Sequence, residues 1–206
     1  MPVLIRKEEE MTSKSASSPT TKSQPLTPER WADLDILFGT HSAYSGCWCM
    51  WWRLTGPDFR KQLGQGNKRA MKKIVDSGEV PGILAYVGGQ PAGWCSFGPR
   101  EKFGRLERSP TLKRIDQEPV WSIVCYYVDK PYRGQGLMEK LTKAAIDYAS
   151  RQGARIIEGY PVELTGKVRL DAAYTGIAPL FRQMGFVEVL RRAENRPIMR
   201  YYIEKK

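Results

Sequence analysis

The residues Arg133-Gly134-Gln135-Gly136 combine a cation with two glycines in a short turn, a pattern that suits the binding of a phosphate group. An apolar run at residues 120–128 precedes the turn and has the length and the β-branched and aromatic content of a buried strand. From Leu137 onward, apolar residues recur at helical spacing. A glycine turn that leads from a strand into a helix exposes backbone N–H groups at the positive end of the helix dipole. The sequence therefore predicts an anion site, suited to phosphate, at this turn.

Two common phosphate-binding motifs do not fit the turn. A dinucleotide fingerprint requires a third glycine three residues after the second, and this position holds Glu139. A nucleoside-triphosphate loop requires Gly-Lys-Ser/Thr, whereas Leu137 and Met138 follow Gly136. Residues 128–137 instead have the pattern Val-x-x-x-Tyr-Arg-Gly-x-Gly-Leu.

This pattern resembles the acetyl-CoA loop of the GCN5-related N-acetyltransferase (GNAT) superfamily, which commonly reads Val-x-x-x-Tyr-Arg-Gly-x-Gly-Leu/Ile-Gly. Residues 180–186 are similar to the second signature of that family, Leu-Tyr-x-x-x-Gly-Phe. The resemblance covers roughly residues 79–190. Two positions depart from it, because Met138 stands where the family has Gly or Ala and Phe181 stands at the tyrosine of the second signature.

The resemblance implies an α/β (α+β) fold: a mixed, mostly antiparallel central sheet with helices on both faces and a parallel strand pair that splays apart at the coenzyme site. The hydrophobic pattern itself predicts a strand–helix–strand unit around the turn, which should form a right-handed parallel crossover. The other predicted strands are 82–87 and 91–97 (a hairpin), 154–160, 187–190 and 196–203. The other predicted helices are 28–38, 57–77 and 175–184, with a short one near 112–115 in a polar excursion, 98–118, that should overhang the cleft.

Composition divides the chain into a tail and one domain. Residues 1–26 are rich in Ser, Thr, Lys and Pro, and we expect them to be disordered because they have too few large apolar residues to form a core. Residues 27–206 suffice for a single GNAT-like domain. The formal net charge is +11, of which the tail contributes only +1, from four Lys/Arg and three Asp/Glu.

The charge and the apolar content bear on partners and location. A basic surface can steer an anionic coenzyme or substrate, and no nucleic-acid motif accompanies it, so nucleic acid is not expected as the main partner. No apolar run reaches the length of a membrane span, and the N-terminus lacks the apolar core of a secretion signal. We therefore expect a cytoplasmic protein without a membrane partner, and a homodimer is compatible with the sequence.

The resemblance also assigns the coenzyme contacts. Backbone groups at the end of the central strand should pair with the amides of the pantetheine arm, as an added strand would. The N–H groups from Arg133 to Met138 should hold the pyrophosphate. The expected binding residues for acetyl-CoA are Tyr126, Tyr127, Val128, Arg133, Gly134, Gln135, Gly136, Leu137 and Met138.

A second unusual stretch, residues 46–53, holds three tryptophans within five positions. One interpretation is a packed aromatic core; the other is an acceptor pocket lined by Trp48, Trp51 and Trp52, which would suit an apolar or cationic acceptor. Cys47 and Cys49 with the nearby His41 do not have the number or the usual spacing of zinc ligands, so no metal is expected.

Acetyl transfer to an amine, the reaction that the resemblance implies, has three chemical needs. The amine must lose a proton, which costs about 4–5 kcal/mol at pH 7 if its pKa is that of lysine, and Glu158 or Glu163 beside the splayed strands would act as base. A backbone N–H around Tyr126 would stabilise the oxyanion. Since Phe181 cannot donate a proton to the departing thiolate, Tyr174 is the candidate donor.

The predicted function is thus an acetyl-CoA-dependent N-acetyltransferase that acts on an amine of a small molecule or a peptide. Met138 and Phe181 keep an alternative open, namely an acyl-CoA-binding regulatory module with reduced catalysis. A third hypothesis is a basic domain with a role that does not involve the coenzyme, such as RNA binding. A covalent route through Cys125 is conceivable, but no histidine partner for it is evident in the sequence.

Overall fold

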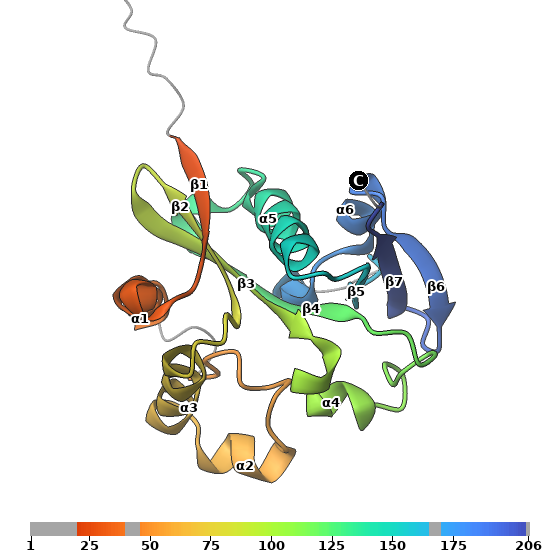
Figure 1. Ribbon diagram of the computed structural model, residues 1–206, viewed down its shortest axis with the longest axis horizontal. Helices are drawn as coiled ribbons and strands as arrows, with labels where there is room; N and C mark the ends of the chain where they lie inside the picture. Colours follow the sequence, from red (N-terminus) through yellow and green to blue (C-terminus); the bar gives the residue numbers. More distant parts are fainter. Residues whose placement is uncertain (1–19, 40–45, 165–169, 205–206) are drawn as a thin grey trace, which may run out of the picture.

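A seven-stranded sheet forms the centre of the structure (Figure 1). The computed structural model describes residues 20–39, 46–164 and 170–204. The strand order is β1-β2-β3-β4-β5-β7-β6, and every neighbouring pair is antiparallel except β4 and β5, which are parallel. The strands are β1 (Thr21–Pro25), β2 (Gly82–Val87), β3 (Gln90–Pro99), β4 (Trp121–Val128), β5 (Ile156–Gly159), β6 (Val187–Arg191) and β7 (Pro197–Tyr202).

Helices cover both faces of the sheet, as predicted. One face packs against α5 (Leu137–Arg151) and α6 (Ala178–Gln183), and the other against α1 (Trp31–Gly39) and α3 (Gln65–Asp76). The shorter helical segments are η1 (Pro28–Arg30), α2 (Gly56–Lys61), η2 (Arg100–Lys102), α4 (Gly104–Glu107), η3 (Lys130–Tyr132) and η4 (Leu170–Thr175). Among the described residues, no helix has the length and apolar character that crossing a membrane requires.

A bulge in β4 opens the sheet at its centre. Val124 has no counterpart on β3, and a bulge of this kind bends the strand. As a result, Val124 and Cys125 both pack on the face of α1 and α4, whereas Ile123 and Tyr126 pack on the face of α5. β5 pairs with β4 only before the bulge, over residues 121–123. The rest of β4 separates from β5, so the predicted splayed parallel pair is present.

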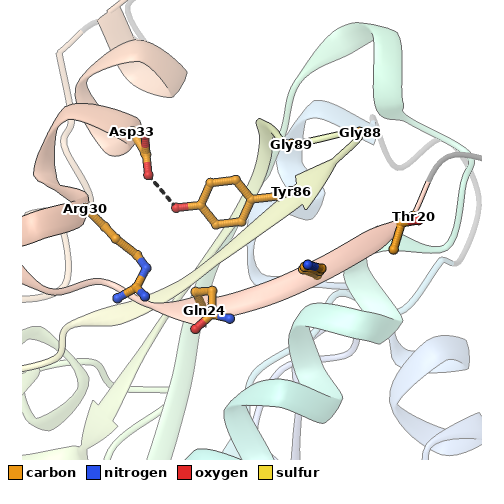
Figure 2. A pocket seen from close by; sticks show the side chains of 8 residues that line it. Thr20, Gln24, Arg30, Asp33, Tyr86, Gly88 and Gly89 are labelled. Atoms are coloured by element: carbon orange, nitrogen blue, oxygen red, sulfur yellow. Dashed lines mark hydrogen bonds between the residues drawn. The ribbon is translucent and has the colours of Figure 1, made fainter.

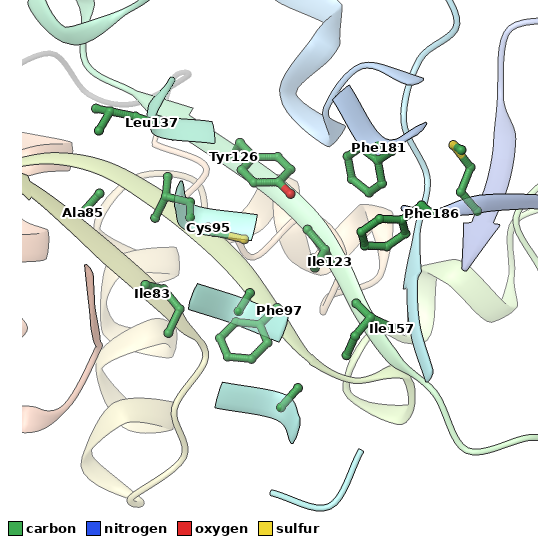
Figure 3. Close-up of a cluster of buried hydrophobic side chains, with 14 of the residues drawn as sticks. Ile83, Ala85, Cys95, Phe97, Ile123, Tyr126, Leu137, Ile157, Phe181 and Phe186 are labelled. Atoms are coloured by element: carbon green, nitrogen blue, oxygen red, sulfur yellow. The ribbon is translucent and has the colours of Figure 1, made fainter. Parts of the chain in front are cut away.

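Phe181 fills the core between α6 and the sheet (Figure 3). Its buried ring meets Tyr126 and Phe186 edge to face, with centroid distances of 6.4 and 4.7 Å. A Cβ atom at Gly159 or at Gly176 would lie 2.1 or 2.5 Å from this ring, so glycine at both positions makes room for it. Phe181 is therefore a packing residue.

A buried network of charges ties the excursion after β3 to β5 and β7. Glu158 accepts from Arg100 Nη1 and from Arg200 Nε, both at 2.8 Å, and the Tyr160 hydroxyl donates to it at 2.7 Å. Asp116 accepts from the two Nη groups of Arg200 at 2.6 and 2.9 Å. Because each buried charge has an opposite partner, the network avoids the desolvation cost of an isolated ion.

Two local predictions are wrong. The predicted disordered tail extends too far, because residues 21–25 form β1, which pairs with β2 throughout, and Leu26 is fully buried. An edge strand with partly exposed polar side chains leaves little apolar signal in the composition. Residues 1–19 lie outside the described part. The short helix expected near 112–115 is also wrong, since the helical turns of this excursion are η2 and α4.

Candidate active site

A cleft of about 660 Å³ lies where β4 leaves β5, and we refer to it as the β4 cleft. The end of β4 and the following turn form one wall, together with the first turn of α5. η4 and α6 form the opposite wall. The lining residues include Tyr126, Tyr127, Val128, Tyr132, Arg133, Gly134, Gly136, Leu137, Met138, Tyr174, Ile177 and Leu180.

The glycine turn presents free backbone donors to this cleft. Gly134 and Gly136 have φ angles of +75° and +71°, a left-handed conformation that favours glycine, and nothing lies within 4 Å of a Cβ at either position. α5 begins at Leu137 without a side-chain cap, and Lys140 is the first residue whose N–H bonds back to the Gly136 carbonyl. The N–H groups of the first turn are thus available to an anion at the positive end of a 15-residue helix.

The predicted coenzyme residues gather in the β4 cleft with one exception. Gln135 does not line it, because its side-chain amide turns back and donates to the Pro131 carbonyl at 3.0 Å. Arg133 Nε donates to the Val128 carbonyl at 3.0 Å and so fixes the turn against the end of β4. Met138 lines the cleft while it also packs against the core under α5. The Met138 side chain thus takes up space in the β4 cleft that a glycine at this position would leave open.

A second cavity, of about 250 Å³, lies against the opposite face of β4, and we call it the aromatic cavity. It meets the β4 cleft at Tyr126, Tyr127 and Tyr174, which line both. None of the described residues that line it is Asp or Glu. The remaining lining residues are Phe38, Cys47, Trp48, Cys49, Trp51, Trp52, Phe59 and Cys125.

Trp48, Trp51 and Trp52 pack against neighbouring aromatic or core residues and also line this cavity. That the cavity binds the acceptor stays a prediction. Trp48 stacks on Trp31 with centroids 5.9 Å apart, and Trp51 meets Phe59 edge to face at 5.1 Å. The backbone is left-handed at Trp48 and at the following cysteine, with φ of +48° and +52°. Such a conformation is costly for residues other than glycine, and strain of this kind clusters at ligand sites.

A third hollow, of about 520 Å³, lies at the edge of the sheet formed by β1 and β2 (Figure 2). There the Tyr86 hydroxyl donates to Asp33 Oδ2 at 2.7 Å, close to Arg30 and Gln24. It shares no lining residue with the β4 cleft or the aromatic cavity. It is thus separate from the two adjoining cavities.

The comparisons with known proteins agree with this geometry. The model of the acetyltransferase (GNAT) family matches residues 48–165, more than half of the chain. The chain belongs to this family. The predicted family, fold and acyltransferase class are confirmed, and acetyl-CoA is the co-substrate. A search of curated protein sequences found no match.

Solved structures similar to this GNAT chain share its fold at low identity. A PaiA N-acetyltransferase from Thermoplasma acidophilum, in complex with coenzyme A, is 10% identical with a TM-score of 0.50, covering 89% of this chain and 99% of that chain. A polyamine N-acetyltransferase from Drosophila melanogaster is 9% identical with a TM-score of 0.53, over 89% and 100%. A GNAT acetyltransferase from Listeria monocytogenes is 9% identical with a TM-score of 0.55, over 89% and 95%.

Neither carboxylate predicted as the base of this GNAT enzyme lines the β4 cleft or the aromatic cavity. Glu158 is buried in the network with Arg100 and Arg200. Glu163 accepts from Arg182 Nη1 and Arg191 Nη2, both at 2.9 Å, and these two hydrogen bonds lower its pKa to about 2. A carboxylate with two guanidinium partners is a weak proton acceptor, so the geometry favours neither residue as base.

Tyr174, the predicted proton donor, stands between the two cavities of the GNAT site. It comes from η4, and burial raises the pKa of its hydroxyl. The group therefore keeps its proton at neutral pH, as a donor must. By contrast, the Tyr126 hydroxyl turns into the core, 2.6 Å from Thr142 Oγ1, and is not available to a ligand.

Two thiols of the aromatic cavity, those of Cys47 and Cys49, are held in the neutral form. Burial raises the pKa of Cys47 to about 11, and the contact with Cys125 together with burial raises the pKa of Cys49 well above its usual value. Cys49 Sγ lies 3.7 Å from Cys125 Sγ and accepts from Trp94 Nε1 at 3.1 Å. Metal binding requires a thiolate, and the described residues contain no cluster that could hold a metal ion. His41 lies outside the described residues.

Sequence reasoning missed several residues of the aromatic cavity. Phe38 and Phe59 line it from α1 and α2, where their spacing is that of ordinary core positions. Arg105 of α4 is not among the described residues that line the cavity, but its guanidinium carbon lies 3.6 Å from the centroid of Trp51, which does line it. The expected position of the excursion over the site was the one signal that pointed to Arg105.

Proposed function

We propose that this GNAT enzyme binds acetyl-CoA in the β4 cleft and acetylates the amine of a small molecule whose apolar or aromatic body enters the aromatic cavity. The observation that carries the proposal is the junction of the two cavities at the C-terminal half of β4, where Tyr126, Tyr127 and Tyr174 line both. A thioester carried in from the cleft would meet an amine held in the cavity at this junction.

The cleft fits the coenzyme through its backbone. The glycine turn and the uncapped first turn of α5 would hold the pyrophosphate, and Arg133 lies beside them with an exposed side chain. The edge of β4 beyond residue 123, which β5 leaves, would pair with the pantetheine amides as an added strand does. Bound in this way, the coenzyme supplies the acetyl group as a thioester.

The aromatic cavity favours the form of the amine that attacks. Burial in an apolar surrounding disfavours the charged form and lowers the pKa of an amine. The cavity offers no carboxylate to hold an ammonium ion among its described lining residues. Desolvation by Trp51, Trp52 and their neighbours would therefore deliver a neutral amine, and the proton leaves to solvent before the attack.

β4 and Tyr174 would serve the remaining steps. As the nitrogen–carbon bond forms and the carbon–sulfur bond breaks, a backbone N–H around Tyr126 would stabilise the negative charge on the acetyl oxygen. Tyr174 would give its proton to the departing sulfur and recover one from the attacking nitrogen, which becomes positively charged on attack and must lose a proton to give the amide. This assignment replaces the family tyrosine, whose position holds the buried Phe181.

Release of free coenzyme A across a panel of amines tests the proposal, alongside calorimetric titration with acetyl-CoA. Turnover with an apolar or aromatic amine supports it. Binding of acetyl-CoA without turnover on any amine would instead favour the regulatory module that Met138 and Phe181 leave open. Absence of binding would contradict both. Turnover only with amines too large for the cavity, such as a folded protein, would contradict the proposed acceptor.

We also propose a cytoplasmic location. All four cysteines are free, and Cys49 and Cys125 remain thiols although their sulfurs lie only 3.7 Å apart. Free thiols at this distance suit a reducing compartment. Fractionation of cells with an antibody against the chain would test the location.

A further inference from the structure

Arg105 stands out among the arginines that surround the active site. Its guanidinium carbon lies over the ring of Trp51, 3.6 Å from the centroid, and its Nε and Nη2 atoms are buried without a hydrogen-bond partner. A buried donor that lacks an acceptor costs free energy, and the cost is larger for a charged group. The position is thus one at which a ligand with acceptor atoms would be stabilised.

The two arginines that are buried as whole residues have carboxylate partners. Arg100 pairs with Glu107 and Glu158, and Arg200 with Glu158 and Asp116. None of the ion pairs found among the described residues includes Arg105, nor do any include its neighbours Arg60 and Arg108. Among the described residues, carboxylates thus neutralise the buried Arg100 and Arg200, whereas the half-buried Arg105 has no carboxylate partner.

Arg105 and Arg60 converge on the same piece of backbone. A Cβ atom at Gly56 would lie 3.5 Å from Arg60 Nη1 and 3.7 Å from Arg105 Nη2. Burial and the charges of Arg108 and Arg60 lower the pKa of Arg105, while Tyr174 and Cys47, both of which line the aromatic cavity, raise it. Because Tyr174 and Cys47 are uncharged at neutral pH, the neighbouring charges that act on the guanidinium there are those of Arg60 and Arg108, and it lies in a positive local field.

The positive charge at Arg105 and Arg60 disfavours one class of acceptor and favours another. A polyamine would bring further positive charge next to Arg105 and Arg60, and like charges at close range are repelled. A carboxylate would supply two oxygens in the planar geometry that a guanidinium binds. The aromatic rings of the cavity would hold an apolar or aromatic body at the same time.

We propose that the acceptor carries a carboxylate as well as its amine, as an aromatic amino acid or a related amino acid does, and that Arg105 binds this carboxylate beside Trp51. The inference rests on the proposed function, because it names the acceptor class of the same site. Trp51, which lines the acceptor cavity, then also holds the guanidinium in place, and Arg60 adds to the positive charge.

Matched pairs of amines, with and without the carboxylate, test the inference through kcat/KM. Suitable pairs are tryptophan with tryptamine, tyrosine with tyramine, and 4-(aminomethyl)benzoate with benzylamine, which differ in the distance from amine to carboxylate. We expect the carboxylate member of at least one pair to be preferred on the order of 10- to 100-fold, the range for a hydrogen-bonded charge pair.

Substitution of Arg105 identifies the residue responsible. Arg105→Gln should abolish the preference, because it should raise KM for the carboxylate member far more than for the partner amine. Arg105→Lys should retain part of the preference, since it keeps the charge and loses the planar pair of donors. Arg69→Gln, which removes an exposed arginine of α3, is the control for loss of one positive charge.

A binding measurement keeps the test independent of turnover. Titration of 3-phenylpropionate, which has no amine, into the enzyme with coenzyme A should show binding that Arg105→Gln weakens, with unchanged affinity for coenzyme A. If the enzyme acetylates the plain amines as well as or better than their carboxylate partners, or if Arg105→Gln affects both alike, the inference is wrong and the proposed function stands. If no amine is acetylated, the proposed function itself fails.

Discussion

The β4 cleft and the aromatic cavity share one strand but are built from different materials. The cleft is made of backbone, with two left-handed glycines, the uncapped start of α5 and the free edge of β4. The cavity is made of side chains from α1, α2, β4, η4 and residues 47–52. A binding site made of backbone depends on a short local motif, whereas one made of side chains depends on how distant segments meet. The two halves should therefore respond differently to substitution.

The largest effect is expected for Gly136→Glu in the cleft. The new side chain must adopt a left-handed backbone and brings a negative charge to the site of the pyrophosphate, so we expect the Kd for acetyl-CoA to rise by more than about 100-fold. Calorimetric titration measures this. Gly153→Glu is a matched control, because Gly153 ends the same helix with φ of +84° and open space around it, but lies outside both cavities. Equal loss of binding in the two variants would mean that strain alone is responsible.

Much of the cleft could be predicted because its signal is local. Residues 128–137 carry the turn, the arginine and the helix start within ten positions, and each of these features has its own physical reason. β1 could not be predicted, since a polar edge strand owes its stability to backbone pairing with β2. The lining of the cavity by Phe59 and the approach of Arg105 to Trp51 depend on tertiary packing, which no spacing in the sequence reports.

The prediction of Glu158 as the base failed because it too depends on tertiary packing. Its place beside the splayed strands was predictable, but its side chain lies on the face where Arg100 and Arg200 neutralise it. The arginines come from positions 58 residues before it and 42 after it, so the pairing is invisible in the local sequence. The face of the sheet to which the Glu158 side chain points from β5 therefore gives it a structural role and not a catalytic one.

Tyr174→Phe tests the residue at the junction of the two halves. We expect kcat to fall about 100-fold, the contribution of a positioned proton donor, with an unchanged Kd for acetyl-CoA. Since burial raises the pKa of Tyr174, the donor stays protonated as the pH rises, and the ratio of wild-type to variant kcat should be constant from pH 7 to pH 9. Tyr148→Phe, on α5 and outside both cavities, should leave kcat unaltered. A Tyr174 variant with full kcat would remove its role as acid.

Trp51→Ala should weaken acceptor binding in the aromatic cavity without affecting the β4 cleft, and its effect should be smaller than that of Tyr174→Phe. Loss of one aromatic wall is expected to raise the KM of the acceptor about tenfold, because an aromatic contact contributes roughly 1 kcal/mol beyond the area it buries. The Kd for acetyl-CoA should not change. Trp121→Ala controls for the general loss of a tryptophan, since Trp121 packs against Phe97 and Tyr148 away from both cavities. If acceptor KM is the same in both variants, the cavity does not bind the acceptor.

The smallest effect is expected for Glu163→Gln. This variant tests whether the amine needs a carboxylate base, since the aromatic cavity is proposed to deliver the amine already neutral. Arg182 and Arg191 hold the pKa of Glu163 at about 2, below the ordinary value of 4.5, so the folded state favours the carboxylate. This contribution to stability is present above pH 4.5 and is lost as the pH falls towards 2. The variant should thus be less stable at pH 7 by under about 1 kcal/mol, a difference that narrows in acid, and its kcat should equal that of the wild type. A large fall in kcat with unchanged stability would instead make Glu163 the base, and the amine would then lose its proton to a side chain rather than through desolvation.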